Sequence, residues 1–361
     1  MTPPAGAIRS LHAVVLALRA RAGAMPMLLA ALLLVAALMQ PTLPVRRLQV
    51  NAVAVVDITQ SMNVLDGQPE GQAGGKPLSR LAQAKATLAQ LIARLPCGSR
   101  LGLAIFTEYR SFLLLTPVEV CEHQQELLGT LARMDGRMAW AGASEVAKGI
   151  NSGMEAVKAL EGTPTLLFLT DGHESPPVNP GYRPRFTVDR GSVRGLIVGV
   201  GGDELRPIPK FDPSGIAQGL WGPDEVLQVD PRSLGRGGSV GGEQMVDPNE
   251  VRAAPLPGAT PGSEHLSSLR EDYLRLLAGE TGLAYQRLVG AGALGEALAS
   301  PRLAHEAPAR LDLRPWLGGA ALLCVLLPLL PSPSNWRVRR RQAPAPGGLQ
   351  PAARRAMRPQ R

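Results

Sequence analysis

Short apolar segments of strand length, separated by segments of helical periodicity, restrict the fold of this chain more than any other feature. The strand-like segments are mainly apolar and lie at residues 50–56, 101–106, 112–115, 165–170, 193–200 and 284–288. Between and after them, apolar residues recur every three or four positions, as in amphipathic helices, at residues 81–95, 146–160 and 266–277. Strands that are apolar on both faces must be covered on both faces. The alternation therefore predicts a doubly wound α/β domain with a mostly parallel sheet.

One strand pair and one long segment depart from this regular alternation. A short turn at Glu108 and Tyr109 joins the second and third strand-like segments, so these two strands should form an antiparallel pair at the sheet edge. Residues 201–262 are rich in Gly and Pro and are too long for an ordinary connection. We interpret them as a functional insertion or a mobile loop within a domain that spans residues 48–290. A linker at residues 291–313 should follow this domain.

Oxygen-bearing side chains follow the strands at the points where the strands end. The first strand ends at Asp57, and Thr59 and Ser61 follow at alternate positions, so the three side chains can point the same way. The fourth strand is followed by Asp171, and Ser144 stands just before a helix. Ligands of an open α/β sheet collect at the carboxyl ends of the strands. Two carboxylates and three hydroxyls are hard oxygen donors, which predicts a site for Mg²⁺, or for Ca²⁺ or Mn²⁺.

This set of residues resembles the metal-ion-dependent adhesion site of the von Willebrand factor A (VWA) family. That site uses an Asp-x-Ser-x-Ser run, a distant Thr and a distant Asp. In this sequence Asp57, Thr59 and Ser61 form the run. Ser144 stands in place of the distant Thr, and Asp171, in the stretch TDG, matches the distant Asp. The resemblance implies that hydroxyls bind the ion directly and that an acidic side chain of a partner completes the coordination.

A closer resemblance is to the accessory VWA proteins encoded with bacterial methanol dehydrogenases. It is carried by the stretches DITQSMNVLD, TDGHESPPVNP and GGSVGGEQMV. The resemblance implies a non-enzymatic module that engages a protein client through its ion. The client would be a periplasmic quinoprotein dehydrogenase that is assembled, or supplied with calcium, together with other accessory membrane proteins. The alternative function is a chelatase-like component that acts with a cytoplasmic MoxR-type AAA ATPase, and an unrelated α/β hydrolase is a more distant alternative.

Two uncharged apolar runs flank the predicted domain. Residues 22–40 follow a basic N-terminus, residues 1–21, and residues 316–331 precede an Arg-rich tail, residues 332–361. Runs of about 18 residues can cross a bilayer, and positive charge outside both runs favours cytoplasmic termini. We therefore predict two transmembrane helices in a bacterial inner membrane, with the VWA domain in the periplasm. A cleaved signal peptide is the alternative for the first run, and a buried core helix is the alternative for the second.

Other functional classes lack their sequence signatures. The net charge of +8 comes from the tail, because its eight arginines account for the excess and leave 30 basic and 30 acidic residues elsewhere. No basic stripe is interleaved with aromatic residues, so nucleic acid is not an expected partner. The sequence has no Walker A loop, and the glycines at residues 199–203 lack the third glycine of a dinucleotide fingerprint. No Ser–His–Asp or Cys–His order offers a nucleophile, so an enzyme is not expected.

Several residues near the expected site have competing interpretations. Asp57 can cap its strand without binding metal, although the other coincident motifs favour the metal site. His173, Glu145 and Glu174 are interpreted as solvated residues of surface loops rather than as members of the site. Trp140 belongs either to the core or to a binding rim.

The cysteines predict one disulfide. Cys97 precedes the second strand and Cys121 follows the third, and their midpoint, residue 109, falls in the turn between these strands. Positions equally far from such a turn lie opposite each other, close to disulfide distance. We therefore predict a Cys97–Cys121 bond, which an oxidising periplasm would preserve. Two unpaired thiols are the alternative, and Cys324 in the second apolar run has no partner.

Overall fold

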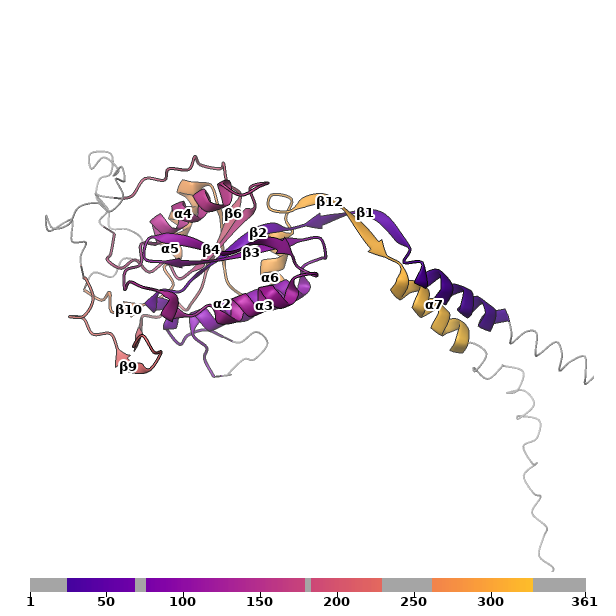
Figure 1. The fold of residues 1–361 in the computed structure, drawn as a ribbon. Coiled ribbons are helices and arrows are strands. Elements are labelled where there is room, and N and C mark those ends of the chain that lie inside the picture. Colours follow the sequence, from indigo (N-terminus) through magenta and orange to yellow (C-terminus); the bar gives the residue numbers. More distant parts are fainter. Residues whose placement is uncertain (1–24, 69–75, 179–182, 229–261, 327–361) are drawn as a thin grey trace, which may run out of the picture. The chain divides into compact units, whose positions relative to one another are not determined.

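The central feature of the fold is a six-stranded sheet in the order β11-β6-β5-β2-β3-β4 (Figure 1). The computed structural model describes residues 25–68, 76–178, 183–228 and 262–326. The strands of the sheet are β2 (Asn51–Asp57), β3 (Arg100–Thr107), β4 (Arg110–Glu119), β5 (Thr165–Thr170), β6 (Gly195–Gly199) and β11 (Ala284–Arg287). All neighbouring pairs are parallel except β3 and β4, which are antiparallel at one edge. The strands, the parallel pairing and the antiparallel edge predicted from the sequence are confirmed.

Helices cover both faces of the sheet, which makes the domain doubly wound (Figure 1). One face packs against α2 (Arg80–Arg94), α3 (Gln124–Arg133) and α6 (Ala291–Leu298), and the other packs against α4 (Val146–Lys158) and α5 (Glu271–Thr281). Successive side chains of β2 point to opposite faces, so Ala54 and Val56 join the first core and Val53 and Val55 join the second. Burial on both sides explains why this strand is apolar throughout.

Helix α4 lies very close to the sheet because it carries a glycine at the point of contact. A Cβ atom at Gly149 would lie 2.1 Å from a ring carbon of Phe106 on β3. No larger residue fits without moving the helix. The glycine therefore sets the height of α4 above the sheet, and with it the position of the loop that precedes α4.

Two segments differ from the sequence expectation. The predicted linker, residues 291–313, contains α6, whose Ala291, Leu294 and Leu298 are buried, the two leucines in the first core. These side chains recur at three and four positions, but the helix is too short for its periodicity to be conclusive. The helix expected to begin near residue 266 begins at Glu271, because Leu266 belongs to strand β10 (Leu266–Ser267).

The insertion at residues 201–262 is partly built from strands. Strand β7 (Arg206–Pro207) pairs with β10, and β8 (Pro209–Phe211) pairs with β9 (Ala217–Leu220) in a hairpin. Within this segment, residues 229–261 lie outside the described part of the chain. The 3₁₀ turn η1 (Gln60–Asn63), which follows β2, contacts β8. The insertion thus returns to the carboxyl end of the central strand.

The Cys97–Cys121 disulfide predicted from the sequence is confirmed, with the two Cα atoms 5.4 Å apart. It joins the start of β3 to the end of β4, at the end of the hairpin away from Glu108. Arg100, at the start of β3 near Cys97, pairs with Asn51 at the start of β2, whereas Asp57 is at the end of β2. The disulfide therefore lies at the opposite end of β2 from the candidate site.

Of the described residues, 25–45 and 309–326 belong to a second unit of the chain, and the first unit is residues 46–308. The second unit contains a helix at residues 25–38 and α7 (Arg314–Leu326). Strand β1 (Thr42–Gln49) pairs with β12 (His305–Asp312). Within the described ranges, no helix has both the length and the apolar character needed to cross a bilayer. Of the predicted membrane segments, residues 22–40 and 316–331, positions 22–24 and 327–331 lie outside the described part of the chain.

Candidate metal centre

Three loops at the carboxyl edge of the sheet bring the five predicted site residues together. Asp57 ends β2, Thr59 and Ser61 follow it into η1, Asp171 follows β5, and Ser144 stands before α4. All five residues are no more than 3% exposed. The side chains that were expected to meet because they follow strand ends therefore lie together. Ser144 follows no predicted strand, and its assignment came from the family resemblance alone.

Asp57 is held by hydroxyl groups on both carboxylate oxygens. Its Oδ1 accepts from the Thr59 amide at 2.8 Å and from the Thr59 hydroxyl at 2.7 Å, and its Oδ2 accepts from the Thr170 hydroxyl at 2.6 Å. Burial and the neighbouring Asp171 raise the pKa of Asp57 to about 7, against the effect of these hydrogen bonds. A divalent cation bound beside Asp57 would stabilise its ionised carboxylate and so lower this pKa.

Asp171 is held by a buried arginine. Arg80, the first residue of α2, donates from Nη1 to Asp171 Oδ2 at 2.6 Å, and the Ser267 hydroxyl lies 3.2 Å from the same oxygen. The other oxygen, Oδ1, accepts from the His173 amide at 3.0 Å. Burial favours the neutral acid, but Arg80 and smaller contributions, including a hydrogen bond from Ser61, outweigh it and lower the pKa of Asp171. Asp171 is therefore the anionic member of the carboxylate pair.

The Ser144 side chain gives the most direct indication that the site suits a bound cation. Its hydroxyl is buried and has no hydrogen-bond partner among the residues that the structure describes. Its backbone is fixed, because its amide donates to the Ser175 carbonyl at 2.6 Å and its carbonyl accepts from the Ser175 amide at 2.7 Å. A buried polar group without a partner costs about 1–3 kcal/mol. A cation bound by the lone pairs of this hydroxyl would remove that cost, so the residues present fit a metal ion.

Glu174 fixes the loop that carries Ser144, and its interpretation as a solvated residue is wrong. It is 9% exposed and accepts from the Val146 and Ala147 amides at 2.9 and 3.0 Å. It also accepts from the Tyr273 hydroxyl at 2.7 Å. The residue that precedes α4, Glu145, makes no side-chain cap, so Glu174 satisfies the first amides of the helix from another loop. Burial raises the pKa of Glu174 to about 7.

His173 is also buried, so its interpretation as a solvated loop residue is wrong. Its side chain lines a pocket beside Thr59, Ser61 and Ser144, and in the described part of the chain its Nδ1 has no hydrogen-bond partner. Burial lowers the pKa of His173 to about 4, so the ring is neutral at physiological pH. By contrast, Trp140 is 58% exposed, lies edge-on to Phe112 and is not among the residues that line this pocket.

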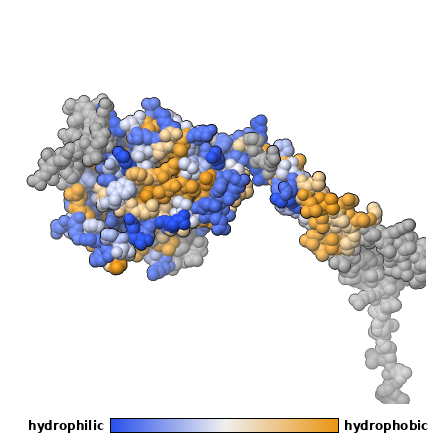
Figure 2. All heavy atoms as spheres, in the orientation of Figure 1, coloured by the Kyte–Doolittle hydropathy of each residue, from blue (hydrophilic) through white to orange (hydrophobic). Residues whose placement is uncertain are grey.

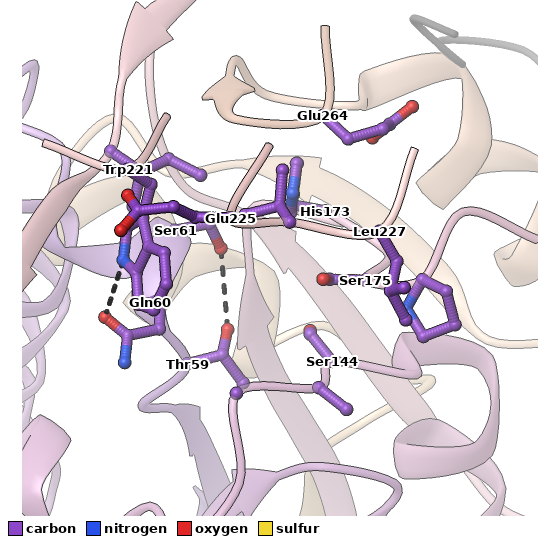
Figure 3. A pocket seen from close by; sticks show the side chains of 15 residues that line it. Thr59, Gln60, Ser61, Ser144, His173, Ser175, Trp221, Glu225, Leu227 and Glu264 are labelled. Atoms are coloured by element: carbon purple, nitrogen blue, oxygen red, sulfur yellow. Dashed lines mark hydrogen bonds between the residues drawn. The ribbon is translucent and has the colours of Figure 1, made fainter. Parts of the chain in front are cut away.

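The pocket has a volume of about 190 Å³, and Figure 3 shows its lining side chains. Candidate ligands form one wall, and the insertion contributes Ile208, Trp221 and Leu227 to another. The Trp221 Nε1 donates to Gln60 Oε1 at 3.3 Å, so the insertion is attached to the same turn that carries Ser61. No pattern in the local sequence predicts that the insertion lines this pocket.

Arg80 is the principal site residue that sequence reasoning missed. Its side chain is fully buried and also pairs with Asp66, at 2.7 Å from Nη2 to Oδ2. One signal was available: a positive charge at the first residue of a helix opposes the helix dipole, and the first turn of α2 has no acidic residue. An arginine in that position needs an acidic partner elsewhere in the chain.

Comparison with known proteins finds only distant similarities. No family model and no curated protein matches the chain. Among solved structures, the conserved hypothetical protein BatB from Bacteroides thetaiotaomicron is 16% identical, with a TM-score of 0.42, over 69% of this chain and 95% of that chain. An aerotolerance-related membrane protein from Bacteroides fragilis is 16% identical, with a TM-score of 0.41, over 69% and 96%. The ArnB paralog VWA2 from Sulfolobus acidocaldarius is 12% identical, with a TM-score of 0.30, over 72% and 47%.

Proposed function

We propose that this chain is a non-enzymatic protein-binding module of the VWA type that engages its partner through a divalent metal ion. The ion is Mg²⁺, or Ca²⁺ or Mn²⁺, and its ligands are Asp57, Thr59, Ser61, Ser144 and Asp171. One observation carries the proposal: five buried oxygen donors from three loops meet at one edge of the sheet, and one of them, the Ser144 hydroxyl, has no partner within the described residues. Oxygen donors of this kind suit hard cations.

The charge of the donor set favours an external acidic ligand. Three of the five donors are neutral hydroxyls, and Asp171 is already paired with Arg80. A divalent ion held in this way retains positive charge, and the pocket at Thr59, Ser61 and Ser144 leaves room beside it. A carboxylate from a partner protein would neutralise that charge. Such binding is stronger in a partly buried site than in water because the local dielectric constant is lower.

The proposed location is a bacterial inner membrane, with the metal-binding domain in the periplasm. Large apolar side chains are exposed on the helix at residues 25–38 and on α7, including Leu28, Leu32, Trp316 and Leu323 (Figure 2). Exposed apolar surface of this kind suits contact with lipid. The Cys97–Cys121 disulfide supports an oxidising compartment.

The client is proposed from the sequence resemblance alone. It is a periplasmic quinoprotein dehydrogenase that the module helps to assemble or to load with calcium. In an oxidising compartment the domain would be separated from a cytoplasmic AAA ATPase, so the disulfide favours this proposal over the chelatase-like alternative.

Calorimetric titration of Mg²⁺, Ca²⁺ and Mn²⁺ into the full-length protein in mild detergent tests the proposal. We expect one site in the wild type, no binding by Asp57→Ala, and binding weakened at least tenfold by Ser144→Ala. Asp272→Ala is the matched control, because Asp272 is an exposed aspartate on α5 outside the site. Equal binding by Asp57→Ala and the wild type would show that the site is assigned wrongly.

A further inference from the structure

The pocket beside the candidate metal centre has one polar wall and one apolar wall. Thr59, Ser61 and Ser144 face it from the metal side, and Ile208, Trp221 and Leu227 face it from the insertion (Figure 3). Its volume of about 190 Å³ is below the roughly 300–1,000 Å³ of ordinary small-molecule sites. A space of this size suits a short peptide segment with two neighbouring side chains better than it suits a large cofactor.

The apolar wall is held in a fixed relation to the metal ligands. Besides its bond to Gln60, Trp221 donates its amide to the Ile208 carbonyl at 3.0 Å, and Lys210 Nζ lies 4.6 Å from the centre of its indole ring. Gln60 stands between Thr59 and Ser61 in the sequence. A ligand that reaches the ion would therefore meet Trp221 within a residue or two.

His173 adds a hydrogen-bonding requirement to the pocket. It is 3% exposed, its ring is bonded to the backbone of Glu264, and no described residue provides a partner for its Nδ1. The bond to the Glu264 backbone engages the other nitrogen, Nε2, as the donor, which leaves Nδ1 as the acceptor. The pocket therefore calls for an N–H or O–H group on its ligand.

Two acidic residues that line the pocket do not exclude an acidic ligand, because each has a basic partner. Glu225 is paired with Lys210, and Glu264 lies 3.7 Å from Arg270. The negative charge of each glutamate is therefore offset by the positive charge of its basic partner. The charge that a ligand meets is then set mainly by the ion.

We propose that this pocket binds an extended peptide segment of a protein partner, in which an acidic residue lies within two positions of a large apolar residue. The acidic side chain reaches the ion, the apolar side chain packs against Ile208, Trp221 and Leu227, and a backbone N–H of the peptide donates to His173 Nδ1. This inference rests on the proposed function, because the acidic side chain is bound through the ion.

Selection from a random heptapeptide library tests the inference. The full-length protein in mild detergent is used as bait, once with Mg²⁺ and once with EDTA. We expect magnesium-dependent enrichment of Asp or Glu within two positions of Leu, Ile, Phe or Met. For one selected peptide, anisotropy should show about tenfold weaker binding after its apolar residue is replaced by Ser, in line with the loss of one buried apolar side chain.

Protein variants locate the peptide in the pocket. Trp221→Ala should weaken peptide binding about tenfold, and His173→Phe about fivefold, the size of one hydrogen bond. Leu227→Ala, which trims the apolar wall and keeps the Trp221–Gln60 bond, should also weaken peptide binding and should leave the affinity for Mg²⁺ unchanged. Trp316→Ala, an exposed tryptophan of α7 in the other compact unit, is the matched control and should bind like the wild type.

The outcomes separate the two proposals. If calorimetry finds no Mg²⁺ binding by the wild type, the proposed function fails and this inference fails with it. If Mg²⁺ binds but no peptide is enriched, or if enriched peptides need only an acid, the inference alone fails. It also fails if Trp221→Ala binds the peptide normally, or if succinate competes as tightly as the peptide, which would identify a small carboxylate as the ligand.

Discussion

Replacing Arg80 by methionine should destabilise the domain strongly in the absence of divalent metal. The side chain is fully buried and donates to Asp66, to Asp171 and to both the hydroxyl and the carbonyl of Ser267. Its removal leaves two buried carboxylates without their positive partner. Breaking a buried ion pair from one side costs about 3–5 kcal/mol. At about 2–4 °C per kcal/mol for a domain of this size, the melting temperature should fall by roughly 10 °C.

Metal should recover part of this loss. An ion at a concentration 100 times its dissociation constant stabilises a protein by about 2.7 kcal/mol. In Arg80→Met the ion also gives Asp171 a new positive neighbour, so Mg²⁺ should raise the melting temperature more in the variant than in the wild type. Asp66 is not among the proposed ligands, so recovery should be incomplete.

Thermal unfolding followed by circular dichroism, in EDTA and in Mg²⁺, provides the measurement. Arg275→Met is the matched control, because Arg275 is 60% exposed and pairs with Glu271 on the surface of α5. Exposed pairs of this kind contribute less than about 1 kcal/mol. The reasoning is refuted if Arg80→Met melts within 2 °C of Arg275→Met, or if Mg²⁺ shifts both variants equally.

Three further predictions concern the packing, the disulfide and pH. Gly149→Ala should cost about 1–3 kcal/mol and weaken Mg²⁺ binding, because the new Cβ meets Phe106 and displaces α4. Gly279→Ala on α5, where a Cβ meets nothing, should be neutral or stabilising in the same thermal and calorimetric assays. Replacing Cys97 and Cys121 together by serine should cost roughly 3 kcal/mol in urea unfolding but leave Mg²⁺ affinity unchanged; a change in affinity would contradict the separation of the two sites. Because the pKa of Glu174 is raised from 4.5 to about 7, its contribution to stability is complete below pH 4.5 and is lost as the pH rises through 7. Glu174→Gln should therefore flatten the fall in metal-free stability between pH 5 and pH 8, and an unchanged slope would disprove this role.

The sheet was predictable because its signal is local. A strand such as β2, which is buried on both faces, must be apolar at successive positions, and that pattern can be read without knowing its neighbours. Helix α6 was not predictable in this way, because its eight residues give too few turns for periodicity to separate a packed helix from a linker. Its helical state follows from contacts with α2 that the local sequence does not contain.

The candidate ligands were partly predictable for the same reason. Asp57, Thr59 and Ser61 lie together at a strand end, and the roles proposed for them follow from that position. The states of His173 and Glu174 were not predictable, because residues distant in sequence bury them: Glu174 meets Tyr273, and His173 faces a pocket closed by Trp221. The Arg80–Asp171 pair spans 91 positions, a separation at which sequence spacing carries no geometric information.

Anomalous diffraction at the manganese edge, from crystals of the full-length protein grown with Mn²⁺, tests the central claim most directly. The proposed function predicts one strong peak at the carboxyl edge of β2, within about 2.3 Å of the Ser61 and Ser144 hydroxyl oxygens, since hard cations lie at about 2.0–2.6 Å from their oxygen ligands. It also predicts that the peak is lost in Asp57→Ala crystals. A map with no peak between these two serines, at a manganese concentration that saturates binding in solution, would contradict the assignment of this edge of the sheet as a metal site.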